Sequence, residues 1–426
     1  MRKVLLVAYH FPPVAGSSGV QRTLRLAQYL PEYGWKPVVL TVDPSAYEWI
    51  DDSSLTEIPQ DCEVIRTPCL DARKHLSVRG RYPRFVALPD RWASWRLWAV
   101  RRGLRLVRHH GIDALWSTYP IATAHQIGAA IARRSRKPWV ADFRDPMAQD
   151  GYPRDTERWK SYKRIEAEAA ARASMLTFAS PSARETYVER YREVPDDKFH
   201  LVENGFDESS FDGLRPRSGA QPLTRTPVLL HSGIVYPLER DPRALFAALG
   251  KLASQGRIMP GDFVLRFRAP VHDAMLEKLA RAHRVESFVE IRPPIPYREA
   301  LQEMFDADAL VAMQGASCNE QIPAKVYEYL RARKPVLGLA DPNGDTGRLL
   351  ASTGFDFVVP LEATERIEAA LPRFLAGLAA GTLFRPSVQA IERYSRKALT
   401  GRFAALFDEA VRRSAASALT GARASQ

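Results

Sequence analysis

Short apolar runs that alternate with amphipathic stretches are the feature that most constrains the fold of this chain. In the first half, strands are predicted at Lys3–Ala8, Pro37–Asp43, Ala114–Thr118 and Pro138–Asp142, and a helix over Val20–Tyr33. Strands that alternate with helices build a parallel sheet with helices on both faces. Such sheets bind ligands beyond the carboxyl ends of their strands, in the loops that lead into helices.

The same pattern restarts after a polar, turn-rich segment, which predicts a second domain of the same architecture. A length of 426 residues fits two or three domains of roughly 150 residues each. The expected fold is α/β, with two Rossmann-like, doubly wound domains facing a cleft. The predicted parts are an N-terminal domain at 1–206, a linker at 207–226, a C-terminal domain at 227–385, a helix at 386–411 packing back toward the N-terminal domain, and a disordered tail at 412–426.

Composition narrows the class of protein further. The formal net charge of +12 favours anionic partners, namely nucleotides, nucleic acid or an anionic membrane surface. No RNA-binding or zinc-finger signature is present, so we expect no nucleic acid. The three cysteines lack metal-ligand or redox spacing, and no stretch approaches the ~18 apolar residues that span a bilayer. The expected location is the cytoplasm, either free or peripheral on the inner face of the plasma membrane.

The first strand leads into a loop rich in glycine and proline, Tyr9–Gly19. Gly16 and Gly19 allow backbone amides to approach a ligand, and the following helix offers its positive N-terminal end to a phosphate. The alternative is a simple turn. A dehydrogenase site with Asp43 on the second strand is disfavoured because the loop lacks the G-x-G-x-x-G spacing.

The segment Asn319–Pro335 carries the most informative polar residues. Pro323 suits the first turn of a helix, and Lys325 and Glu328 are three residues apart and share one face of it. A lysine at a helix start suits a phosphate, and a carboxylate one turn later suits the two hydroxyls of a ribose. Glu320 precedes the helix and could reach another part of the same ligand. The alternative is a surface Lys–Glu pair worth only ~0.2–0.5 kcal/mol.

Glu320 and Glu328 are separated by seven residues, and EYLRARKPVLG follows. This segment resembles the Glu-x7-Glu motif of retaining GT-B glycosyltransferases, family 4 in particular. The resemblance extends to LVENGFD at 201–207, to HSGIVYPLERDPRALFAAL at 231–249 and to YSRKALTGRFAALF at 394–407, and so covers the chain to about residue 410.

The resemblance implies roles for individual residues. Glu320, Arg240 and Lys325 would be the catalytic group, with Glu320 at the donor sugar and the two cations clamping the diphosphate. Glu328 would bind the ribose. The residues that would bind the nucleotide-sugar are Glu328, Gly16, Gly19, Gly233, Ile322 and Ala324.

Two positions depart from the family pattern. Ile234 stands where many relatives carry an arginine, and Asp142, Arg144 and Asp145 end a strand where many carry a histidine. These three residues are candidates for contact with the acceptor or the sugar. The alternative is an Arg–Asp pair that orders the loop, and no general base is assigned.

The activity that the resemblance implies is transfer of a sugar, with retention, from a nucleotide-sugar to a hydroxyl of a glycan. The expected acceptor is a lipid-linked intermediate of surface polysaccharide biosynthesis. No cofactor is expected, and the reaction would be independent of metal. Two alternatives stay open, namely a nucleotide-sugar epimerase of the same fold and a non-catalytic subunit that binds sugar nucleotides.

The segment Arg73–His110 holds eleven Lys or Arg residues and a single acid, Asp90. Trp92, Trp95 and Trp98 recur at three-residue spacing. A basic helix with aromatic residues along one side suits an anionic membrane surface. The alternative is that the tryptophans pack into the core and the arginines are only solvated.

Overall fold

The computed structural model describes residues 1–15, 19–79, 81–215 and 225–424. The chain divides into two compact units. The N-terminal unit comprises Met1–Asn204 together with Arg396–Gln426, and the C-terminal unit comprises Gly205–Ser395. No helix in the described part of the chain has the length and hydropathy needed to cross a bilayer.

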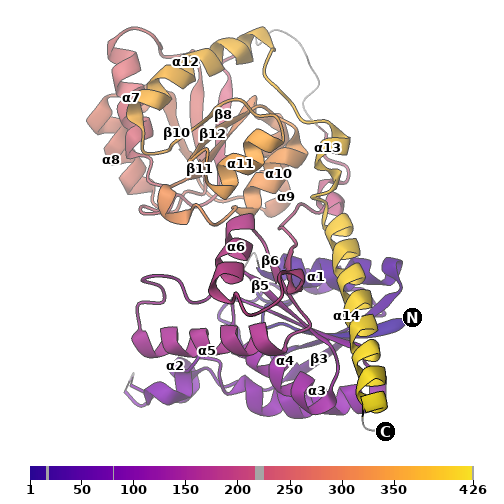
Figure 1. Cartoon of the computed structure of the whole chain (residues 1–426). Helices are drawn as coiled ribbons and strands as arrows, with labels where there is room; N and C mark the ends of the chain where they lie inside the picture. The colour runs from indigo at the N-terminus through magenta and orange to yellow at the C-terminus, as the bar shows by residue number, and fades with distance from the viewer. Residues whose placement is uncertain (16–18, 80, 216–224, 425–426) are drawn as a thin grey trace. The chain divides into compact units, whose positions relative to one another are not determined.

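A parallel sheet forms the centre of the N-terminal unit (Figure 1). It has seven strands in the order β3-β2-β1-β4-β5-β6-β7. Every neighbouring pair is parallel. The strands are β1 (Arg2–Val7), β2 (Trp35–Val42), β3 (Glu63–Thr67), β4 (Ala114–Thr118), β5 (Trp139–Arg144), β6 (Met175–Phe178) and β7 (Phe199–Leu201). The order reverses between β1 and β4, which therefore form the topological switch point of this sheet.

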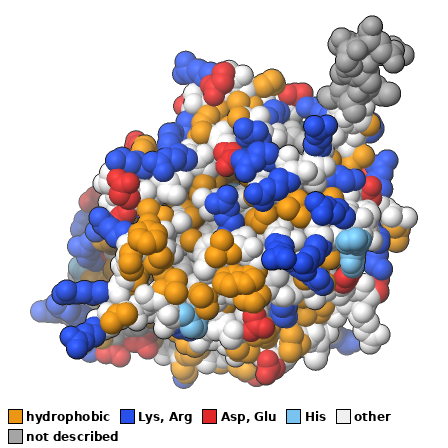
Figure 2. All heavy atoms as spheres, turned by 90° about the horizontal axis from the view of Figure 1, so that it is seen from below, with side chains coloured by type: hydrophobic (Ala, Val, Ile, Leu, Met, Phe, Trp, Pro, Cys, Tyr) orange, Lys and Arg blue, Asp and Glu red, His pale blue; other side chains and the backbone are white. Residues whose placement is uncertain are grey.

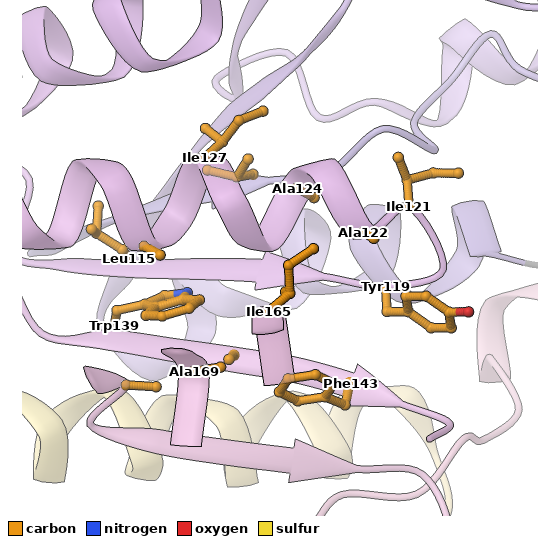
Figure 3. Close-up of a cluster of buried hydrophobic side chains, with 14 of the residues drawn as sticks. Leu115, Tyr119, Ile121, Ala122, Ala124, Ile127, Trp139, Phe143, Ile165 and Ala169 are labelled. Atoms are coloured by element: carbon orange, nitrogen blue, oxygen red, sulfur yellow. The ribbon is translucent and has the colours of Figure 1, made fainter. Parts of the chain in front are cut away.

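Helices cover both faces of this sheet because its central strands are buried on both sides. One core lies beneath α3 and α4, where apolar residues of α4 pack on Leu115 and Trp139 of the sheet (Figure 3). The other core contains side chains from α1 and α14. The helices are α1 (Gly19–Tyr29), α2 (Ala72–His75), α3 (Trp95–His110), α4 (Ala122–Ser135), α5 (Thr156–Arg172), α6 (Pro181–Arg190) and α14 (Arg396–Ala424).

The C-terminal unit repeats this architecture with a six-stranded parallel sheet of order β10-β9-β8-β11-β12-β13. Its strands are β8 (Val228–Ser232), β9 (Val264–Arg268), β10 (Val289–Arg292), β11 (Ala309–Gln314), β12 (Val336–Ala340) and β13 (Val358–Val359). Its helices are α7 (Arg243–Ser254), α8 (Asp273–His283), α9 (Tyr297–Asp306), α10 (Ala324–Ala332), α11 (Asp345–Ser352), α12 (Thr364–Ala380) and α13 (Val388–Glu392). The order reverses between β8 and β11, the switch point of this unit.

The predicted linker is partly a structured piece of the C-terminal unit. Phe206 and Phe211 are buried in its core, with ring centroids 6.4 Å apart. Arg331 on α10 forms an ion pair with Glu208. The N-terminal unit thus ends at Asn204, two residues before the predicted boundary, because these aromatic side chains are buried in the second core. Residues 216–224 of the predicted linker lie outside the described part.

The end of the chain differs more clearly from the prediction. The predicted helix at 386–411 is two helices in different units: α13 belongs to the C-terminal unit, and α14 belongs to the N-terminal unit through buried Leu399, Phe403 and Phe407. The prediction of a disordered tail from residue 412 is wrong as far as Ala424, since α14 continues to that residue. Alanine has the highest helix propensity, and the tail is rich in it. Ser425 and Gln426 lie outside the described residues.

Candidate functional site

The switch point of the C-terminal sheet brings together most of the predicted donor-site residues. The loop that follows β8 holds Gly233 and Arg240, and the loop that follows β11 leads through Glu320 and Ile322 to α10. Because β8 and β11 are neighbours, both loops leave the same edge of the sheet. This edge is where doubly wound sheets bind their ligands.

Close backbone contacts hold the two loops together. The backbone N–H of Gly315, after β11, donates to the carbonyl of Glu239 at 2.7 Å. Gly233 has a φ of +107°, and a Cβ there would lie 3.0 Å from Nζ of Lys325. The backbone conformation favours glycine at this position, and a side chain there would press on the end of Lys325. The amine of Lys325 therefore lies directly against the loop of the other strand.

Three basic side chains gather at this point. Nζ of Lys325 lies 3.2 Å from Nε2 of His231, whose Nδ1 lies 2.9 Å from the carbonyl oxygen of Val311. Since a carbonyl only accepts, His231 donates from Nδ1 and offers a lone pair at Nε2. Arg240 donates from Nη1 to the carbonyl of Ile234 at 3.1 Å, and its guanidinium lies 5.1 Å from the ring centre of Tyr236.

The charges of this basic cluster are not balanced by ion pairs. Neither Lys325 nor Arg240 lies within ion-pair distance of a carboxylate in the described part of the chain, and Nε of Arg240 is buried without a described partner. Burial and the nearby Arg240 lower the pKa of Lys325 to about 7, although Glu328 acts in the opposite direction. Burial, followed by the charge of Lys325, lowers the pKa of His231 well below its ordinary value. An unbalanced, partly desolvated set of cations is suited to binding an anion.

The two glutamates of the predicted motif lie on either side of the start of α10. Glu328 is on α10 and accepts a hydrogen bond from the hydroxyl of Tyr297, the first residue of α9, at 2.8 Å. Glu320 is exposed in the preceding loop. Asn319 fixes that loop, because its side chain donates to Asp341 at 2.6 Å and its carbonyl accepts from the N–H of Asp345 at 2.8 Å.

Ile322 and Ala324 connect these elements. Ile322 is buried at 9% exposure in the core beneath α10, and Ala324 is the first residue of the helix. The first N–H groups of a helix have no partner within it and carry partial positive charge. The start of α10 therefore adds to the positive character of the site.

In the N-terminal unit, Asp142 is not available to a ligand. It is fully buried in β5 and accepts two hydrogen bonds from Arg22, at 2.8 and 2.7 Å. The hydroxyls of Thr118 and Thr177 donate to it at 2.8 and 2.7 Å. Burial alone would raise the pKa of Asp142, but Arg22 and Thr177 hold it below its ordinary value. Its role in the fold is to join α1 to three strands.

Arg144 and Asp145 lie at the carboxyl end of β5 and differ from Asp142 in having little internal bonding. Arg144 has a φ of +63°, donates weakly to the carbonyl of Tyr119 at 3.4 Å, and has a buried Nε without a described partner. Burial raises the pKa of Asp145, against the opposing effect of Arg144. The alternative was an Arg–Asp pair that orders this loop, and within the described residues Arg144 and Asp145 form no such ion pair. Arg144 and Asp145 therefore remain candidates for binding a ligand of the N-terminal unit.

His10 is a further candidate that the sequence did not reveal. It follows β1 at the switch point of the N-terminal sheet, and burial and the charge of Arg144 lower its pKa to about 4. The position of His10 directly after the first strand is the sequence signal that could have identified it as a candidate site residue. Gly19 starts α1, whereas Gly16 lies outside the described residues. The described residues contain no group of three or more His, Cys, Asp or Glu side chains arranged to hold a metal ion.

Comparison with known proteins defines the class of fold. Residues 18–205 match the family model of the glycosyl transferase 4-like domain, which falls in the N-terminal unit almost completely. A comparison with curated proteins finds no significant sequence match. Each unit has the Rossmann-like α/β architecture of GT-B structures, which the solved structures below share.

Three solved structures resemble nearly the whole chain. Anabaena HepE in complex with UDP has a TM-score of 0.64 and 14% identity, over 96% of this chain and 100% of that chain. Sucrose-phosphate synthase from Thermosynechococcus elongatus has a TM-score of 0.63 and 17% identity, over 96% and 99%. The α,α-trehalose 6-phosphate synthase from Burkholderia multivorans has a TM-score of 0.60 and 11% identity, over 98% and 99%. At these identities the likeness shows a shared fold.

The Arg22–Asp142 pair predicts a large effect on stability. Arg22→Met leaves a buried carboxylate without its cation, and we expect the free energy of unfolding at neutral pH to fall by ~3–5 kcal/mol in urea denaturation. The pKa of Asp142 is lowered in the folded state, so the pair stabilises the fold above the ordinary carboxyl pKa. The deficit of the variant should shrink as the pH falls through the lowered pKa.

Arg133→Met is the matched control, because Arg133 lies 3.7 Å from Glu168 in a pair that is largely exposed. An exposed pair contributes ~0–1 kcal/mol. Equal losses in the two variants would contradict the structural role assigned to Asp142. Arg22→Lys, which keeps the charge but not the two-point contact, provides an intermediate case if Arg22→Met does not fold.

Proposed function

We propose that this protein is a retaining glycosyltransferase that takes a sugar from a nucleotide-sugar and passes it to a hydroxyl of a glycan. The observation that carries the proposal is the unbalanced cation cluster of Lys325 and Arg240 at the switch point of the C-terminal sheet, with Glu328 one helical turn beyond Lys325. Anabaena HepE, which shares this fold, has been solved in complex with UDP and with UDP-glucose.

Each donor-site residue has a chemical task in this proposal. Lys325 and Arg240, together with the start of α10 at Ala324, bind the diphosphate. The negative charge of the diphosphate grows as its bond to the sugar breaks, and fixed positive groups stabilise charge where it develops. Glu328 accepts hydrogen bonds from the ribose hydroxyls, while the exposed Glu320 contacts the donor sugar. The backbone of Gly233 and of Ile322 lines the proposed nucleotide-sugar site.

Retention requires the acceptor hydroxyl to attack from the face that the diphosphate leaves. The new bond forms from the acceptor oxygen to the anomeric carbon as the bond to the phosphate oxygen breaks. The acceptor proton passes to that departing oxygen, so no protein base is needed. The cations that neutralise the diphosphate do the work for which other enzymes use a metal ion, and we propose that the reaction is independent of metal.

The acceptor in this proposal is bound by the N-terminal unit, with Arg144 and Asp145 as the contacting side chains. Arg144 has a buried Nε–H without a described partner, and Asp145 forms no ion pair with another described residue. Gly19, at the start of α1, offers a close backbone approach.

The acceptor is further proposed to be lipid-linked, because α3 presents a basic surface suited to an anionic membrane. Trp95 is fully buried and Trp92 packs against the core, so two of the three tryptophans are structural. Leu97 and Trp98 remain exposed, at 72% and 36%. The basic face of α3 consists of the exposed residues Arg96, Arg101, Arg102, Arg105 and Arg108.

None of these five arginines forms an ion pair with a described residue, whereas Arg84 and Arg91 nearby are paired with Asp155 and Glu48. Figure 2 looks onto the underside of Figure 1, where α3 is labelled, and shows blue Lys and Arg side chains spread among hydrophobic ones with fewer red acids. Unpaired cations beside exposed apolar side chains are the combination that anionic bilayers bind. We propose a peripheral attachment here during polysaccharide biosynthesis.

The proposed activity is tested by a thermal-shift screen with UDP, GDP, dTDP and ADP, followed by incubation with the corresponding nucleotide-sugars. We expect one base to stabilise the chain and its nucleotide-sugar to release free nucleotide, slowly with water and faster with an acceptor. Recovery of an epimerised sugar nucleotide would favour the epimerase. Binding without turnover under both conditions would favour a non-catalytic subunit.

Glu328→Ala should weaken binding of the nucleotide found in that screen by ~1–3 kcal/mol, the range for losing a hydrogen bond to a charged group, or about 5- to 150-fold in affinity. Isothermal titration calorimetry measures this effect. Glu277→Ala is the control, because Glu277 is an exposed residue of α8 that lies 3.8 Å from Arg281. Unchanged affinity of Glu328→Ala would remove Glu328 from the ribose site.

The joint replacement of Arg101, Arg102, Arg105 and Arg108 by Gln should release the protein from anionic vesicles. At ~1 kcal/mol per arginine, the loss amounts to about three powers of ten in the partition coefficient, measured by co-sedimentation with phosphatidylglycerol-containing vesicles. The matched control replaces four exposed arginines of the C-terminal unit by Gln, namely Arg257, Arg281, Arg366 and Arg373. Equal loss in both variants would mean that net charge, not the basic face of α3, determines binding.

A further inference from the structure

His231 is the one member of the basic cluster that has no assigned role. It is the fourth residue of β8, fully buried, and its ring is fixed by the hydrogen bond from Nδ1 to the carbonyl of Val311 on the neighbouring strand. That bond turns Nε2, with its lone pair, toward Nζ of Lys325 at 3.2 Å. The sheet therefore holds an acceptor in position for the lysine.

The surroundings of Lys325 disfavour its charge while the site is empty. The groups that face it are His231 from β8, Arg240 from the loop before α7, and Glu328 from its own helix. Burial and Arg240 lower the pKa of Lys325, and Glu328 offsets only part of this, leaving it at about 7. Burial lowers the pKa of Arg240, and the nearby Tyr236 and Glu239 oppose this effect.

We propose that His231 is a positioning residue for Lys325, and that Lys325 takes up a proton from solvent when a nucleotide diphosphate binds. The inference rests on the proposed function. An anion beside Lys325 favours the protonated form of the amine, because its charge attracts the ammonium group more strongly than Arg240 repels it. His231 accepts one N–H of Lys325 in either state and leaves the other hydrogens of the amine for phosphate oxygens.

The proposal gives binding a distinctive dependence on pH. With a pKa of about 7 in the free protein and a higher value in the complex, the uptake should be small at pH 6 and should rise toward one proton at pH 8. Affinity should be constant below about pH 6 and should fall up to ~10-fold per pH unit above pH 7. A lysine that is already charged would give neither effect.

Calorimetry on the full chain measures the uptake directly. The probe is the intact nucleotide-sugar of the base that binds in the screen of UDP, GDP, dTDP and ADP. It is titrated at about pH 6, 7 and 8 in buffers of different ionisation enthalpy. The slope of the observed enthalpy against that ionisation enthalpy is the number of protons taken up. The intact sugar diphosphate is used because a free terminal phosphate, with a pKa of about 6, would itself titrate.

Lys325→Arg identifies the group that takes up the proton. Arginine stays charged at every pH used, so we expect no proton uptake and an affinity that no longer falls above pH 7. Uptake that persists in this variant would place the proton elsewhere and overturn the inference.

Two variants of His231 separate positioning from a structural role. His231→Gln places an amide oxygen near the position of Nε2 and so keeps an acceptor for Lys325. His231→Asn keeps a donor for Val311 but does not reach the lysine. We expect the affinity of His231→Gln to stay within about 3-fold of the original, and that of His231→Asn to fall about 10-fold. Thermal midpoints of both variants show whether they are folded.

The outcomes are distinct. Binding of a nucleotide-sugar without proton uptake at any pH overturns the inference and leaves the proposed function intact. Equal affinities of His231→Gln and His231→Asn remove the positioning role. If none of the four nucleotides binds, the proposed function and this inference fail together.

Discussion

The candidate donor site depends on a set of cations that the fold brings together with no carboxylate of the described residues within ion-pair distance. Arg240 lies in the loop after β8 and Lys325 in the first turn of α10, which follows β11. The backbone hydrogen bond between Gly315 and Glu239 keeps the loops after these two strands at one edge of the sheet. Gathering like charges in a partly desolvated place is unfavourable, and burial followed by the charge of Arg240 lowers the pKa of Lys325. Such a cluster is suited to binding an anion, which is the basis of the proposed donor site.

The buried arginine of the N-terminal unit shows the contrasting case. Arg22 is almost fully buried, but Asp142 meets it with both oxygens and two threonine hydroxyls complete the carboxylate. A charge that is satisfied in this way has no capacity left for a ligand. Arg144 has no such carboxylate within ion-pair distance among the described residues, and its buried Nε–H has no described partner. Completeness of internal bonding thus separates the structural arginine from the candidate ligand contact.

The sequence predicted the parts of the fold that depend on local pattern. The central strands of the N-terminal sheet are continuous apolar runs, so β1, β2, β4 and β5 fall within a few residues of their predicted positions. The edge strand β3 was missed because its residues are mostly half-buried and polar residues interrupt the apolar ones. The helical end of α14 was missed because small residues are common to disordered tails and to helices. Phe206 and Phe211, which pack into the second core, explain why the boundary between the units lies earlier than predicted.

The candidate site was predictable only where residue types sit close together along the chain. Lys325 and Glu328 share one helix, so their common face follows from helical spacing. His231 and Lys325 are 94 residues apart, and their contact exists because β8 and β11 are adjacent in the sheet. Asp142 was predicted as a ligand contact but is occupied inside the fold. Its partner Arg22 lies 120 residues away in the sequence, so the pairing could not be seen there. Whether a polar residue at a strand end is available or already satisfied is decided by partners distant in sequence, and strand order is what selects them.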